Sequence, residues 1–210
     1  MQFFLHEQQY RNLGAVSDKL VTFCGTGALG ANCAENLARM GFTALRLIDR
    51  DRIEAHNLST QPWSRQDIGA PKAKTLAQAL YRAVGCRAEA QVSELSAGNA
   101  TKLLAASAVV VDAFDNMPSR RAVASAAAAL GIPCLHIALG VEGNYGCGLW
   151  DAAYTLADPP SAGLDGCDYP LTRPLAQLVA AAAAEVLARH LLNGERKGFE
   201  ITLGDLNMRG

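Results

Sequence analysis

With 210 residues, the chain is long enough to bury one sizeable hydrophobic core, and we expect a single domain over residues 1–210. The formal net charge is −1 and no polybasic run occurs, so neither nucleic acid nor a membrane surface is an expected partner. The six cysteines are scattered without a CxxC pair, which predicts no zinc site. The first residues lack the features of a secretory signal, and we expect a cytoplasmic protein.

The first part of the chain alternates short apolar runs with stretches of helical periodicity. A strand at 20–24 leads through glycines into a helix at 28–40, and a second strand at 44–48 completes a βαβ unit. A helical crossover of this kind makes the two strands parallel. A long polar loop over 52–70 precedes Pro71, a favoured first-turn residue, which opens the next predicted helix.

The same alternation continues through the middle of the chain. The predicted elements are a weak strand at 87–92, a helix at 97–105, a strong strand at 108–112, a helix at 118–130 and a strand at 132–139. The last elements are an antiparallel segment at 141–150, a loop at 151–170, a buried amphipathic helix at 173–192 and a strand at 199–203. This order predicts a Rossmann-like α/β fold with a mostly parallel sheet, helices on both faces and antiparallel C-terminal strands.

A GxGxxG sequence follows the first predicted strand, with its glycines at Gly25, Gly27 and Gly30. In this context backbone N–H groups approach a phosphate at the N-terminus of the following helix. Asp49 ends the second strand, about where a Rossmann acid binds a ribose hydroxyl. These features predict a bound nucleotide but suit NAD(P) as well as ATP, so an NAD(P)-dependent oxidoreductase is one alternative.

Three further segments narrow the choice: residues 51–61 (DRIEAHNLSTQ), 67–73 (DIGAPKA) and 112–116 (DAFDN). Together with the glycine loop, and in this order, they resemble the ThiF/MoeB/HesA family, relatives of the ubiquitin-activating enzymes. The resemblance covers nearly the whole chain from residue 20 onward. It implies a homodimer that uses ATP and Mg²⁺ to adenylate the C-terminal glycine carboxylate of a small ubiquitin-like or sulfur-carrier protein, with release of pyrophosphate.

The resemblance also implies roles for individual residues. The cofactor-binding set is Gly25, Gly27, Gly30, Asp49, Asn57, Lys72, Asp115 and Asn116. Gly27 and Lys72 would contact phosphates, and Asp49 the ribose. Asp115 would hold magnesium, while Asn57 and Asn116 would shape the nucleotide pocket. Adenylation moves negative charge onto pyrophosphate, so a lysine and a divalent cation are suitable catalytic groups.

One position departs from the family pattern, which usually reads Asn-Leu-x-Arg-Gln. Thr60 stands in the place of that arginine. Arg65 in the same loop, or Arg11 supplied by a partner subunit, is a candidate to replace the charge in catalysis. If neither does so, the chain is a non-catalytic binding or dimerisation module, which is a second alternative.

The remaining reactive side chains receive mostly structural interpretations. Cys167 precedes the last helix, where a thiolate is readily activated, so a covalent role and a structural role both stay open. Trp63 is expected to fill a loop, and Arg120 and Arg121 to lie on a solvated helix face. The histidines, which we expect to be structural because no cysteine or carboxylate stands at metal-ligand spacing, are His6, His56, His136 and His190.

Overall fold

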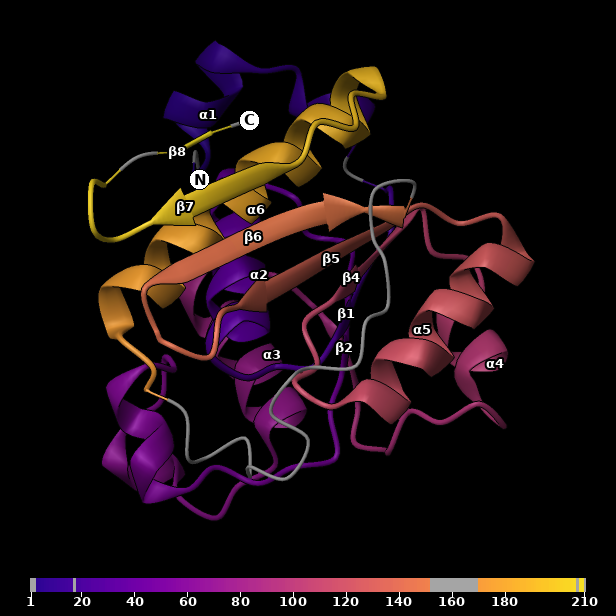
Figure 1. Cartoon of the computed structure of the whole chain (residues 1–210). Helices are drawn as coiled ribbons and strands as arrows, with labels where there is room; N and C mark the ends of the chain where they lie inside the picture. Colours follow the sequence, from indigo (N-terminus) through magenta and orange to yellow (C-terminus); the bar gives the residue numbers. More distant parts are fainter. Residues whose placement is uncertain (1–2, 17, 152–169, 207, 210) are drawn as a thin grey trace.

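The computed structural model describes residues 3–16, 18–151, 170–206 and 208–209. Its centre is a sheet with the strand order β3-β2-β1-β4-β5-β6-β7-β8 (Figure 1). The strands are β1 (Val21–Cys24), β2 (Leu45–Ile48), β3 (Glu89–Gln91), β4 (Val109–Asp112), β5 (Cys134–Leu139), β6 (Tyr145–Trp150), β7 (Phe199–Thr202) and β8 (Met208–Arg209). β1 to β5 are parallel and β6 to β8 join antiparallel, which confirms the predicted sheet.

Helices cover both faces of the sheet, as predicted. They are α1 (Leu5–Tyr10), α2 (Ala28–Met40), α3 (Lys72–Val84), α4 (Ala100–Leu104), α5 (Met117–Leu130) and α6 (Arg173–Asn193), with short 3-10 turns η1 (Leu13–Ala15), η2 (Ala55–Ser59) and η3 (Arg65–Asp67). α2, α3 and α6 pack on one face, and α4 and α5 pack on the other (Figure 1). α4 starts three residues later than the predicted helix at 97–105, because the side chain of Asn99, its N-cap, accepts from the amide nitrogen of Ser96 in a turn before the helix, and α4 ends one residue earlier, before Ala106 with its φ of 63°.

Local sequence signals set where most of these helices end. Four of them stop at a glycine in the left-handed region, namely Gly41 after α2, Gly85 after α3, Gly131 after α5 and Gly194 after α6. A glycine there accepts a positive φ without steric cost and lets the last carbonyls of the helix be satisfied. These end points agree with the helical periodicity read from the sequence. The short elements α1 and β8 were not predicted.

α6 is the central helix of one face of the sheet. Within the described part of the chain, it alone is long and apolar enough to cross a membrane, judged by length and composition. Half of its most apolar window is nonetheless buried, and the helix packs against α2 and the strands β5, β6 and β7. This arrangement confirms the predicted buried helix.

The direction of the strand order reverses between β1 and β4. β2 and β3 extend the sheet on one side of this pair, and β5 continues it on the other. In open parallel sheets, ligands bind beyond the carboxyl ends of the strands at such a switch point. Here the switch point brings the glycine loop after β1 beside the segment that follows β4.

Candidate active site

The three glycines of the loop after β1 serve different purposes. Gly25 has a φ of 93°, and a Cβ there would lie 3.1 Å from the carbonyl oxygen of Ala113. A Cβ on Gly30 would lie only 2.0 Å from the carbonyl oxygen of Gly25, so this glycine allows α2 to start close to the loop. Gly27 differs, because the nearest described atom to a Cβ there is Nε2 of Gln61 at 4.0 Å. The loop therefore leaves space at Gly27, in front of the N-terminus of α2, where a phosphate is favoured.

Asp49 holds the glycine loop in place. Its Oδ2 accepts hydrogen bonds from the amide nitrogen of Thr26 at 2.7 Å and from Oγ1 of Thr26 at 3.0 Å, and its Oδ1 accepts from the amide nitrogen of Asp51 at 2.8 Å. Burial raises the pKa of the Asp49 carboxyl, against the opposing effects of these backbone hydrogen bonds and of the charge on Lys72. An ionised carboxylate offers about four acceptor positions. Three of these acceptor positions are used within the protein. Asp49 therefore also stabilises the glycine loop, a role that the sequence did not reveal.

Lys72 begins α3 with its side chain turned inward. Its Nζ lies 3.3 Å from Oδ2 of Asp51, and its backbone N–H donates to the carbonyl oxygen of Asp51 at 2.9 Å. The side chain of Lys72 is 11% exposed, whereas Lys74, two residues later on the same helix, is exposed. The long loop between Asp51 and Lys72 closes on itself, so both residues meet beside Asp49. A lysine at a helix N-terminus is unfavourable for the helix dipole. Its inward position therefore indicates that it binds an anionic ligand rather than serving as a solvated surface residue.

The loop between β2 and α3 is anchored to two helices. Asn57, whose Oδ1 accepts from the amide nitrogen of Glu54 at 2.9 Å, fixes the turn η2. Nδ2 of Asn32 on α2 donates to the carbonyl oxygen of Thr60 at 2.9 Å, and Nε2 of Gln177 on α6 donates to Oδ1 of Asn32 at 3.0 Å. The side chain that replaces the family's arginine is therefore held inside the structure, since Thr60 is 4% exposed.

Trp63 fills this loop as predicted. It is 7% exposed, and its Nε1 donates to Oε1 of the buried Gln61 at 2.7 Å. Because Gln61 also faces Gly27, the indole fixes the side chain that borders the open space of the glycine loop.

Three arginines differ in their relation to this loop. Arg65 is exposed in η3. Arg173, which the sequence analysis did not single out, starts α6 with its Nη1 3.4 Å from the carbonyl oxygen of Ser59. Arg11 pairs with Glu7 at 2.9 Å and with Glu185 at 3.1 Å. Glu185 lies roughly 18 Å along α6 from Arg173, so the structure does not bring Arg11 to the loop of its own chain.

Comparison with known proteins places the chain in a family. The sequence profile of the ThiF family matches residues 2–200. The chain belongs to the ThiF family. The sulfur carrier protein adenylyltransferase of Thermus thermophilus is 36% identical over 116 residues, which cover 54% of this chain and 42% of that protein. The SAMP-activating enzyme E1 of Haloferax volcanii is 34% identical over 131 residues, 60% of this chain and 47% of that enzyme.

This chain thus spans less than half the length of these ThiF-type relatives. Among solved structures, E. coli tRNA N6-threonylcarbamoyladenosine dehydratase superposes with a TM-score of 0.78 at 19% identity, over 90% of this chain and 94% of that one. This likeness shows a shared fold and confirms the Rossmann-like architecture expected from the sequence.

The ThiF-family motif after β4 ends in Asp115 and Asn116, which take different positions. Asp115 is exposed at the carboxyl edge of the sheet. Asn116 caps α5, because its Oδ1 accepts from the amide nitrogen of Ser119 at 3.0 Å. A capping asparagine stabilises the helix whatever the ligand, and this contact adds a structural role to the pocket role that the resemblance implies. Cys167 lies outside the described residues.

The exposure expected for Arg120 is wrong. Its Nη1 lies 3.4 Å from Oδ2 of Asp112, and its Nη2 donates to the carbonyl oxygen of Ile137 at 2.8 Å. The side chain is 10% exposed and Asp112 is fully buried, so the arginine compensates a charge inside the ThiF fold. Arg121, the next residue on α5, is exposed as predicted.

The interpretation of His136 as a histidine without carboxylate partners is also wrong. Its Nδ1 lies 2.9 Å from Oδ2 of Asp112, and its Nε2 lies 3.3 Å from Oδ1 of Asp151. Burial lowers the pKa of His136, but the two carboxylates outweigh this effect and raise it overall. These partners are 24 and 15 residues away in the sequence, and only the pairing of neighbouring strands brings them together.

Proposed function

We propose that this ThiF-family protein binds ATP with Mg²⁺ and adenylates the C-terminal glycine carboxylate of a small ubiquitin-like or sulfur-carrier protein. The observation that carries the proposal is the inward Lys72 beside a glycine loop that is open at Gly27. A cation and a helix N-terminus at one edge of the sheet suit a chain of phosphates. The names of the relatives, a sulfur carrier protein adenylyltransferase and a SAMP-activating enzyme, support this chemistry over NAD(P)-dependent oxidation.

The reaction requires one substitution at phosphorus. An oxygen of the carrier's carboxylate forms a bond to the α-phosphorus, and the bond from that phosphorus to the bridging oxygen breaks with its electron pair leaving on pyrophosphate. Lys72 would stabilise the charge that builds up on the leaving group, and the N–H groups at the start of α2 would orient the phosphates. Asp49 would act mainly through the loop, since its carboxylate already accepts three hydrogen bonds there.

Asp115, which follows β4, would hold the magnesium ion. The carboxylate of Asp115 is exposed at the edge that carries the glycine loop, and its neighbour Phe114 reaches within 3.2 Å of the Cβ position of Gly25. Oxygen ligands are those that magnesium prefers. When bound there, the ion would neutralise charge on the phosphates of ATP.

The missing arginine of the Asn-Leu-x-Arg-Gln pattern needs a replacement in this proposal. Arg173 is held next to the loop through Ser59, and Arg65 lies within the loop itself. Arg11 would have to come from the second subunit of a homodimer. Alanine substitutions at these three positions separate the candidates, because the residue that replaces the charge should reduce activity by about 10²-fold or more when removed.

ATP–pyrophosphate exchange tests the proposal directly. The protein is incubated with labelled pyrophosphate, ATP, Mg²⁺ and a panel of small ubiquitin-fold proteins that end in Gly-Gly. Exchange that depends on one carrier, and that is lost when its last glycine is deleted, is the expected result. If no carrier supports exchange while ATP has no effect on partner binding, the chain is a non-catalytic module and the proposal fails.

A further inference from the structure

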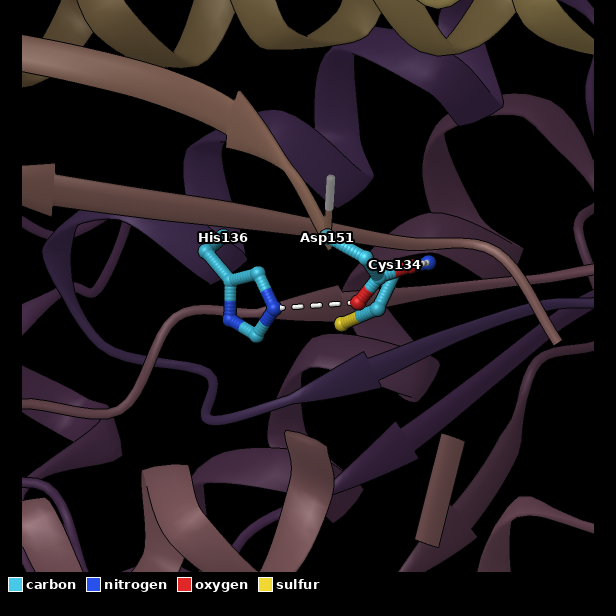
Figure 2. A group of neighbouring side chains, drawn as sticks. All are labelled: Cys134, His136 and Asp151. Atoms are coloured by element: carbon cyan, nitrogen blue, oxygen red, sulfur yellow. Dashed lines mark hydrogen bonds and ion pairs between the residues drawn. The ribbon is translucent and has the colours of Figure 1, made fainter. Parts of the chain in front are cut away.

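Three potential metal ligands lie together on the face of the sheet opposite α6. Cys134 begins β5, His136 follows two residues later on the same face, and Asp151 comes directly after β6. The antiparallel pairing of Leu135 with Trp150 brings Asp151 beside Cys134. Figure 2 shows the three side chains converging, and their ligand atoms all lie within 4.8 Å of one another.

The carboxylate of Asp151 is already oriented toward the histidine. Its Oδ2 accepts from the amide nitrogen of Cys134 at 2.7 Å, which leaves Oδ1 3.3 Å from Nε2 of His136 (Figure 2). In a tetrahedral zinc site with bonds of about 2.0–2.1 Å, a nitrogen and an oxygen ligand are separated by about 3.3–3.4 Å. The observed separation matches this spacing without rearrangement.

The other ring nitrogen of His136 is held by a buried carboxylate. Nδ1 lies 2.9 Å from Oδ2 of Asp112, a fully buried residue that also pairs with Arg120. A carboxylate beside an arginine is an acceptor, so Nδ1 carries the proton, and in the neutral ring Nε2 presents its lone pair toward Asp151. The two electron pairs that face each other there are satisfied either by a second proton on the ring or by a metal cation, and the metal titration below separates these two states. A carboxylate, a histidine and a metal in line are a common arrangement of zinc sites.

We propose that Sγ of Cys134, Nε2 of His136 and Oδ1 of Asp151 bind a zinc ion, with Asp112 as the positioning residue. A thiolate and an imidazole favour zinc over magnesium, so this site is chemically distinct from the one at Asp115. Binding releases the thiol proton of Cys134 to solvent. The side chain of Asp151 is 41% exposed, which gives the ion a route in, and the three ligands leave one tetrahedral position for water or a further ligand.

The zinc ion would cross-link β5 to the end of β6, next to the buried pair of Asp112 and Arg120. We therefore expect it to stabilise the folded protein rather than to take part in adenylation. The proposed site departs from the expectation, drawn from the missing CxxC pairs, that no zinc is bound, and metal titration decides between the two. It does not rest on the proposed function, because metal binding is measured without ATP or carrier.

Cobalt substitution tests the site on the whole chain with any affinity tag removed. The metal-free protein is titrated with Co²⁺, and the expected spectrum shows tetrahedral d–d bands together with a thiolate-to-cobalt charge-transfer band, at one equivalent of cobalt per chain. Zinc should displace the cobalt and raise the melting temperature. A folded wild-type protein that shows no thiolate band and keeps no zinc after gel filtration overturns the proposal, since His136 then bridges two carboxylates as an imidazolium.

Variants identify the ligands. Asp151→Asn keeps an oxygen to accept from the amide of Cys134, so it should fold and bind cobalt at least 10-fold more weakly. Cys134→Ser should abolish the charge-transfer band. Cys147→Ser, a matched change on the neighbouring strand β6, should leave the spectrum unchanged. A charge-transfer band that survives in Cys134→Ser, or an unaltered affinity in Asp151→Asn, contradicts the assignment.

Discussion

The amide nitrogen of Thr26 donates to Oδ2 of Asp49 at 2.7 Å, so the end of β2 fixes the loop that follows β1. Oγ1 of Thr26 donates to the same oxygen at 3.0 Å. The acid that the motif assigns to a ribose is therefore first a support for the phosphate-binding loop. Nucleotide binding and loop stability should consequently depend on the same carboxylate.

Replacing Asp49 with asparagine should weaken both properties. The amide group can accept at only one of its two terminal atoms, so either the two donors of Thr26 or the backbone N–H of Asp51 lose their acceptor. We expect the free energy of unfolding, measured with urea, to fall by about 1–3 kcal/mol. Asp18→Asn, a matched change at an exposed position, should have little effect. Equal stability of the two variants would show that the loop does not depend on Asp49.

Alanine substitutions should separate the glycines of the loop. Gly30→Ala puts a Cβ 2.0 Å from the carbonyl oxygen of Gly25, and backbone must move, so we expect a loss of about 1–3 kcal/mol in stability. Gly27→Ala meets open space and should cost about 1 kcal/mol or less as a helix cap.

Gly27→Ala, which changes stability less than Gly30→Ala does, should nonetheless weaken ATP binding. The methyl group of Gly27→Ala occupies the space in front of α2. The ATP affinity of this variant, measured by isothermal titration calorimetry, should therefore fall by a larger free energy than its loss of stability. Wild-type affinity in Gly27→Ala would exclude this space as the phosphate site.

Lys72 and Lys74 provide a matched pair on one helix. Lys72→Ala removes the inward cation and should reduce ATP–pyrophosphate exchange by about 10²–10³-fold. Its effect on folding should be small, because its partner Asp51 is 56% exposed and stays hydrated. Lys74→Ala should exchange like the wild type. Circular dichroism checks the fold of both, and equal exchange rates in the two variants would remove Lys72 from the mechanism.

Arg120 and Arg121 provide a second matched pair. Arg120→Leu leaves the buried carboxylate of Asp112 without its cation, and breaking a buried pair in this way costs about 3–5 kcal/mol. Arg121→Leu changes an exposed side chain and should stay within about 0.5 kcal/mol of the wild type. Urea denaturation measures both. A similar midpoint for the two variants would mean that Asp112 does not need the arginine.

Much of the fold could be predicted because its signals are local. Apolar runs of four to six residues, helical periodicity and the glycines that end α2, α3, α5 and α6 are all read within a short window of sequence. The six-residue α1 and the two-residue β8 are too short to carry such a pattern, and they were missed. The glycine loop and the position of Lys72 were predicted for the same local reason, since a motif fixes both.

What the sequence determined by itself was therefore the order of the longer elements, the turn at Gly25 to Gly30 and membership of a family that shares this turn. The tertiary structure decided which polar side chains meet. Arg120 turns inward because Asp112 is buried on the adjacent strand, and His136 faces two carboxylates because β4, β5 and β6 pair in one particular register. Charges buried in a low-dielectric interior need partners, and strand pairing joins residues that are far apart in the chain.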